Sequence, residues 1–136
     1  MNNSKFPIED IPDDATLYCR VHFANIDKEN AKIKPAAFDP TPYDNPDGLS
    51  VNWSKYCLTP DQARQGSRKL PNEYGVVSFI VQKVREIPLG VVHDPDDNNQ
   101  AHSLILDIPP RKQNDAKIKM CLLGICKWEI HYKENE

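Results

Sequence analysis

Two histidines flank an acidic, proline-containing loop within the stretch GVVHDPDDNNQAHSLIL at residues 90–106. If residues 89–93 and 101–106 pair as an antiparallel hairpin, we expect His93 to lie opposite His102. The same register places two further pairs on that face, Val91 with Leu104 and Leu89 with Leu106. Cβ atoms of opposed residues are about 4.5 to 5.5 Å apart, so the imidazoles could share a water, an anion or a metal ion. The alternative is that both rings end an apolar face at solvent and hydrogen-bond to the loop.

A second group of polar side chains projects from residues 16–23, TLYCRVHF, which alternate strictly between apolar and polar. The group consists of Tyr18, Arg20 and His22. An arginine or histidine on a first strand is how ADP-ribosyltransferase-like folds begin to hold the pyrophosphate of NAD. Such folds also use a serine and a late glutamate, and Ser50 and Glu129 are available, although no spacing singles them out. The alternative is that Arg20 is solvated or forms a salt bridge between strands.

Other catalytic and metal-binding motifs are absent from the sequence. An EF-hand needs a glycine at the sixth loop position, which is Asn99 here, and a glutamate at the twelfth, which is Ile105. Neither His93 nor His102 begins the His-x-Ser/Thr element of a phosphoesterase. The chain has no phosphate-binding glycine-rich loop, no His-Glu-x-x-His and no Gly-x-Ser-x-Gly.

The four cysteines do not predict a metal site. Cys121 and Cys126 are five residues apart in a predicted helix, which rotates their side chains about 140° from each other. Cys19 lies beside apolar neighbours in a predicted strand, where small buried thiols are common. We therefore expect neither a metal nor a cofactor.

The elements that must position these residues form a mostly antiparallel sheet of about five or six strands, which is an α+β fold. Alternation and β-branched residues predict strands at 16–23, 49–53, 75–86, 89–93, 101–106 and 127–132. Apolar residues at three- and four-residue intervals predict the main helix over 114–126, which should cover the apolar face of the sheet. A threonine-proline pair predicts a short helix near 60–66. Four prolines within 35–48 predict a long surface loop without a helix.

Length and charge limit the classes of protein to which this chain can belong. The 136 residues, 39% of them hydrophobic, suit one domain, which we expect over residues 15–136. Residues 1–14 hold four acidic side chains against one lysine, which is typical of a flexible acidic arm and accounts for the net charge of -3. The neutral remainder argues against general nucleic-acid binding and a membrane-surface role. We see no signal peptide and no apolar run near the roughly 20 residues of a membrane span, so we expect a cytoplasmic protein.

Four strings of residues together resemble a known group. They are L-Y-x-R-V-H at 17–22, Leu-Ser-Val-Asn-Trp at 49–53, Gly-Val-Val-Ser-Phe at 75–79, and Val-Val-His-Asp-Pro with Asn-x-Ala-His at 91–102. Over about residues 15–106 the chain resembles a group of short, uncharacterised bacterial proteins. In that group a proline often follows the first histidine, where this chain has Phe23, and an arginine often stands at the position of Cys19. The resemblance implies no activity. It implies only that the following residues belong to the group's pattern: Arg20, His22, Ser50, Trp53, His93, Pro95 and His102.

The leading functional prediction is a non-catalytic protein-interaction module, a small cytoplasmic accessory protein. It would bind a protein partner through the loop at 35–48 and the acidic arm, and an exposed sheet edge could pair with a second copy. The alternative is an enzyme or nucleotide-binding domain, in which Arg20 holds an anion while one histidine acts as general base and the other as acid. The catalytic candidates are His93, His102, Arg20 and His22, and the binding candidates are Tyr18, Arg20, Ser50, Trp53 and Asp94.

Overall fold

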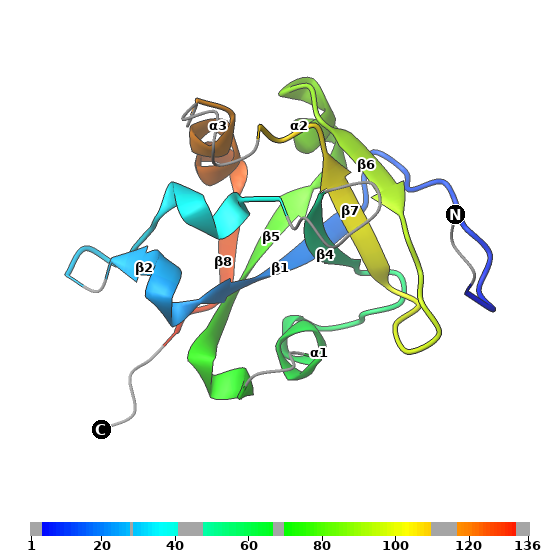
Figure 1. The fold of residues 1–136 in the computed structure, drawn as a ribbon, viewed down its shortest axis with the longest axis horizontal. Coiled ribbons are helices and arrows are strands. Elements are labelled where there is room, and N and C mark those ends of the chain that lie inside the picture. Colours follow the sequence, from blue (N-terminus) through cyan, green and yellow to red (C-terminus); the bar gives the residue numbers. More distant parts are fainter. Residues whose placement is uncertain (1–3, 28, 41–47, 67–69, 110–116, 133–136) are drawn as a thin grey trace.

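A six-stranded antiparallel sheet runs through the molecule (Figure 1). Its strands follow one another in the order β6 (Gly90–His93), β7 (His102–Leu106), β4 (Leu49–Trp53), β1 (Thr16–His22), β5 (Tyr74–Ile80) and β8 (Lys127–Ile130). A small second sheet pairs β2 (Ile26–Asp27) with β3 (Lys32–Ile33). The structure is a computed structural model that describes residues 4–27, 29–40, 48–66, 70–109 and 117–132. It confirms the predicted α+β class and the predicted antiparallel sheet.

The two faces of the large sheet differ because the residues of β1 alternate. Leu17, Cys19 and Val21 are at most 1% exposed and point to one side, which we call the core face. Three elements cover the core face, namely η2 (Pro35–Phe38), α2 (Val81–Glu86) and α3 (Lys117–Ile125), and they contribute the buried side chains Phe38, Val84 and Leu122. The opposite side, which we call the polar face, carries Tyr18, Arg20 and His22, and α1 (Pro60–Gln65) lies against it (Figure 1).

The short helix α1 begins and ends as predicted. The Thr59 hydroxyl accepts a hydrogen bond from the Gln62 N–H at 3.2 Å, which caps the first turn. Pro60 occupies the first helical position, where no N–H partner is needed, and Gly66 ends the helix. The main helix α3 is also confirmed, although residues 114–116 of its predicted range lie outside the described residues.

The prediction of one long strand over 75–86 is wrong in its second half. β5 ends at Ile80, and α2 follows directly with Val81 and Val84 fully buried on one helical face. The N–H groups of Val81 and Gln82 donate to backbone carbonyls of residues 15 and 13, at 3.0 and 2.8 Å. Tertiary contacts therefore satisfy the start of this helix and override the strand preference of its valines.

The prediction of a surface loop over 35–48 is also wrong in part. Residues 35–38 form the 3₁₀ helix η2, and Phe38 is fully buried against Phe79 with ring centroids 5.6 Å apart. Residues 41–47 lie outside the described part of the chain. Two further 3₁₀ turns, η1 (Phe23–Asn25) and η3 (Pro71–Glu73), flank β1 and β5. None of the helices in the described ranges combines the length and apolar character needed to span a bilayer.

Candidate functional site

The hairpin at 89–106 forms, but its register differs by one residue from the prediction. His93 pairs with Ser103, Val91 with Ile105, and Gly90 with Leu106. At the tip, Asp96 still pairs with Asn99. Between the tip and the strands, one arm holds only Asp94 and Pro95, whereas the other holds Gln100, Ala101 and His102. This one additional residue sends the two histidines to opposite faces, so the predicted His93–His102 pair does not exist.

His93 belongs to the core face and is 3% exposed. Its ring meets Trp53 edge-on with centroids 5.2 Å apart and stacks beside Tyr56 at 6.0 Å. Nδ1 accepts a hydrogen bond from the Glu9 N–H at 3.0 Å, and Nε2 donates to the Gln100 carbonyl at 2.7 Å. Both ring nitrogens are thus used in holding the structure together.

The bond to His93 is one of several that dock residues 4–14 on the domain. The Glu9 carboxylate pairs with Lys55 at 2.6 Å and accepts a hydrogen bond from the Tyr56 hydroxyl. Ile11 is 4% exposed and joins the hydrophobic core. These contacts could not be predicted from composition, because acidic and proline residues occur in mobile and in docked segments alike.

On the polar face, the shifted register brings the side chain of His102 into contact with both Asp94 and Ser50. Asp94 follows β6 and points away from the core face because it is next to His93, and its N–H donates to the His102 carbonyl at 2.9 Å. His102 opposes Asn52 of β4 in the ladder, and Ser50 is two residues from Asn52 on the same face. Such diagonal positions are within reach of a histidine side chain.

The hydrogen bonds assign the proton of the His102 ring. Nδ1 lies 2.8 Å from the backbone carbonyl oxygen of Asp94 and 3.2 Å from its carboxylate Oδ2, and both are acceptors. Nδ1 therefore carries the proton, and Nε2 is left to accept a hydrogen bond from the Ser50 hydroxyl at 3.2 Å. A hydroxyl, an imidazole and a carboxylate in this order have the arrangement of a Ser-His-Asp triad.

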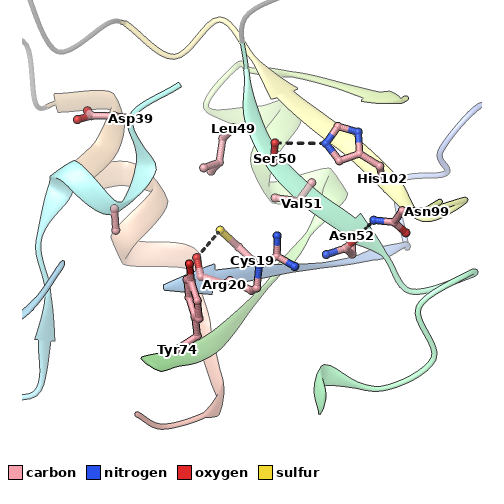
Figure 2. A pocket seen from close by; sticks show the side chains of 11 residues that line it. Cys19, Arg20, Asp39, Leu49, Ser50, Val51, Asn52, Tyr74, Asn99 and His102 are labelled. Atoms are coloured by element: carbon pink, nitrogen blue, oxygen red, sulfur yellow. Dashed lines mark hydrogen bonds between the residues drawn. The ribbon is translucent and has the colours of Figure 1, made fainter. Parts of the chain in front are cut away.

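A cleft of about 230 Å³ opens beside Ser50 because β1 and β4 pair over only two residue pairs, Leu17–Trp53 and Tyr18–Asn52. On the Ser50 side of these pairs the strands diverge, whereas on the other side the Ser54 N–H still donates to the Thr16 carbonyl at 3.0 Å. Figure 2 shows Ser50 and His102 on the β4 side of the cleft, turned toward each other, with Cys19 and Arg20 coming from β1. The remaining lining residues are Ala37, Asp39, Leu49, Val51, Asn52, Tyr74 and Asn99.

Two side chains in the cleft could donate hydrogen bonds to a bound molecule. Asn52 accepts from Asn99 Nδ2 through its Oδ1 at 2.7 Å, and its own Nδ2 has no partner among the described residues. Arg20 donates from Nη1 to the Ala63 carbonyl at 2.9 Å. Within the described ranges no carboxylate forms an ion pair with Arg20. Sequence reasoning missed Asn52 and Asn99, although the alternation in LSVNW already placed Asn52 on the face of Ser50.

The other predicted site residues lie elsewhere. His22 accepts from the Ala24 N–H at 3.2 Å and lies 3.4 Å from Glu73, at the far end of β1. Tyr18 packs against the small cluster of Cys57, Ala63 and Ala101, and burial raises its pKa. Trp53 is in the core beside His93, and Glu129 accepts a hydrogen bond from Ser78 at 2.8 Å. The predicted pocket of Arg20, His22, His93 and His102 is therefore not assembled, because Arg20 and His93 lie on opposite faces.

The described structure also places the thiol of Cys19 and the side chains of metal-ligating type. Burial raises the pKa of Cys19 to about 12, so its thiol stays protonated at neutral pH although it borders the cleft. Among the described residues, no group of three or more His, Cys, Asp or Glu side chains is arranged to hold a metal ion. The absence of a metal and of a cofactor stays a prediction.

Comparison of the chain with protein-family models, with curated proteins and with solved structures finds no match in any of the three.

Proposed function

We propose that the protein is a hydrolase that cleaves small esters with Ser50 as its nucleophile. The observation that carries this proposal is the position of His102, whose ring bridges the Ser50 hydroxyl and Asp94. The tautomer imposed by Asp94 leaves Nε2 able to remove the proton of the Ser50 hydroxyl. The adjoining cleft gives a substrate access to that hydroxyl.

The reaction follows from the positions of these groups. Ser50 Oγ attacks the ester carbonyl carbon while His102 Nε2 takes the hydroxyl proton, and Asp94 stabilises the resulting imidazolium. The tetrahedral intermediate collapses, the C–O bond to the leaving alcohol breaks, and His102 returns the proton to that alcohol. Water then attacks the acyl carbon while His102 Nε2 accepts a proton from it. The bond between the acyl carbon and Ser50 Oγ breaks, His102 returns the proton to Ser50 Oγ, and the carboxylic acid is released. Asn52 Nδ2 is the nearby donor suited to the oxyanion.

The cleft volume limits the size of the substrate. Drug-sized ligands occupy pockets of roughly 300–1,000 Å³, and the cleft of about 230 Å³ is smaller than that range. We therefore assign the enzyme short acyl groups and not long lipid chains.

The experiment is covalent labelling of the purified protein with a small fluorophosphonate, followed by peptide mass spectrometry. We expect the label on Ser50, and no label on this peptide in Ser50→Ala or His102→Gln. Ser54→Ala is the matched control, because Ser54 lies just after the same strand but does not line the cleft. Absence of label from Ser50 at millimolar reagent, in protein shown to be folded by its thermal transition, would overturn the proposal.

A protein partner is kept as a separate proposal, supported by the neutral body and the proline-rich segment, and so is a cytoplasmic location. A pull-down with the intact chain and with the double variant Asp10→Asn, Asp14→Asn, which removes two exposed charges of the acidic arm and keeps its docking contacts, tests the role of the arm. Identical partner lists would remove the arm from this proposal.

A further inference from the structure

The guanidinium of Arg20 faces the same cleft as the proposed nucleophile. The β1–β4 ladder pairs Tyr18 with Asn52, so its next pair on the polar face would join Arg20 with Ser50. The strands diverge before that pair forms, and both residues line the gap instead (Figure 2). Arg20 therefore lies across the cleft from Ser50.

Arg20 is held in place by one hydrogen bond to α1, and this bond leaves most of its donors available. Its Nη1 bonds to the Ala63 carbonyl in the last turn of α1 at 2.9 Å, which fixes the side chain. A guanidinium has five N–H donors in a planar fork, so most of them are not used by this bond. No described carboxylate pairs with it.

The other charged groups at the cleft do not cancel the charge of Arg20. Asp39 borders the cleft, but its carboxylate pairs with the buried ammonium of Lys119. Asp94 does not line the cleft and is turned to His102. A guanidinium that no described carboxylate neutralises, in a narrow cleft, attracts a planar anion that can accept two hydrogen bonds.

We infer that Arg20 binds a carboxylate of the substrate, so that the enzyme prefers short esters that carry a carboxylate over neutral esters of the same size. This inference rests on the proposed hydrolase function, because it names the substrate class of that site. Arg20 is a binding residue in this scheme and takes no part in proton transfer.

The kinetic test compares two esters of similar size, 4-nitrophenyl hemisuccinate and 4-nitrophenyl butyrate. We expect kcat/KM to be larger for the hemisuccinate, and Arg20→Gln to lower the ratio of the two kcat/KM values on the order of tenfold or more. Arg20→Lys should recover part of the ratio, because it restores the charge without the planar fork. Arg64→Gln is the matched control, because Arg64 belongs to α1 but pairs with Asp61 and does not line the cleft.

A binding measurement separates failure of this inference from failure of the proposed function. Succinate is titrated calorimetrically into Ser50→Ala and into Ser50→Ala with Arg20→Gln, and we expect binding only to the former. Succinate binding without Ser50-dependent hydrolysis of either ester would overturn the hydrolase and leave the carboxylate site standing. Ser50-dependent hydrolysis whose ester ratio is the same in wild type, Arg20→Gln and Arg20→Lys would overturn the carboxylate site and leave the hydrolase standing.

Discussion

His93 and Asp94 are neighbours in the chain, yet their side chains lie on opposite faces of the sheet. His93 is buried beside Trp53, whereas Asp94 contacts His102 on the polar face. Substitutions at these adjacent positions should therefore have different consequences, one for stability and the other for catalysis.

We expect His93→Ala to lower the free energy of unfolding by roughly 2–4 kcal/mol. The substitution removes a buried ring and leaves the Glu9 N–H and the Gln100 carbonyl without their partner. Urea denaturation followed by tryptophan fluorescence measures the change. Ester hydrolysis per folded molecule should stay within about threefold of wild type. A loss of hydrolysis as large as that of Ser50→Ala would contradict the placement of His93 outside the site.

His102→Gln should lower kcat for ester hydrolysis on the order of 10³-fold or more, because it removes the base. Asp94→Asn should cost less, on the order of 10- to 100-fold, since the Asp94 backbone carbonyl also holds Nδ1–H at 2.8 Å. Steady-state kinetics on 4-nitrophenyl butyrate measure both effects. Asp97→Asn is the control, because this loop carboxylate contacts the Lys5 N–H and not His102. Equal losses for Asp94→Asn and His102→Gln would show that the backbone contact does not orient the ring.

The docking of residues 4–14 should weaken in acid because of Glu9. Hydrogen bonds from Lys55 and from Tyr56 lower the pKa of Glu9 below its ordinary value of 4.5. A carboxyl with a lowered folded pKa stabilises the folded state above its unfolded pKa, and this stabilisation is lost as the pH falls through the folded value. We expect Glu9→Gln to be less stable than wild type at pH 7, with a smaller difference at pH 3. Thermal melts at both pH values measure it.

Asp10→Asn is the matched control for Glu9, since Asp10 is the next residue and is exposed. It should not reproduce the pH-dependent difference. A stability gap between wild type and Glu9→Gln that is as large at pH 3 as at pH 7 would show that packing, and not the charge of Glu9, holds this segment.

Asp39→Asn should destabilise the fold more than Lys119→Met. Lys119 is 5% exposed and its ammonium pairs with Asp39, so removing the carboxylate leaves a buried, uncompensated charge at a cost of about 3–5 kcal/mol. Methionine in place of Lys119 keeps an apolar stem of similar length, and Asp39 is exposed enough to be solvated. Chemical denaturation of both single variants and the double variant measures the two costs and their coupling. A larger cost for Lys119→Met would contradict this order.

Much of the fold could be predicted from local pattern. The alternation in residues 16–22 and 49–53 correctly assigned side chains to the two faces of the sheet, because successive side chains of a strand point to opposite sides whatever its partner is. The cap of α1 could be predicted in the same way, since Thr59 and Gln62 are three residues apart and the Thr59 hydroxyl accepts the Gln62 N–H. The sequence also indicated the three residues of the candidate site, but His102 as a catalytic candidate and Ser50 and Asp94 as binding candidates, not as one site.

Their assembly into one site depended on contacts between distant segments. The hairpin register shifted by one residue, and Ala101 is held there by the Trp53 N–H, which donates to its carbonyl from another strand at 2.8 Å. Likewise, residues 81–86 form a helix because the carbonyls of residues 13 and 15 accept hydrogen bonds from its first N–H groups, and because Val81 and Val84 pack into the core. The sequence alone determined which way each side chain points along its own strand, because that alternation is a property of a single chain segment. Only the tertiary structure decided which strands oppose each other and at which residue, because register is a balance of contacts among segments far apart in the chain.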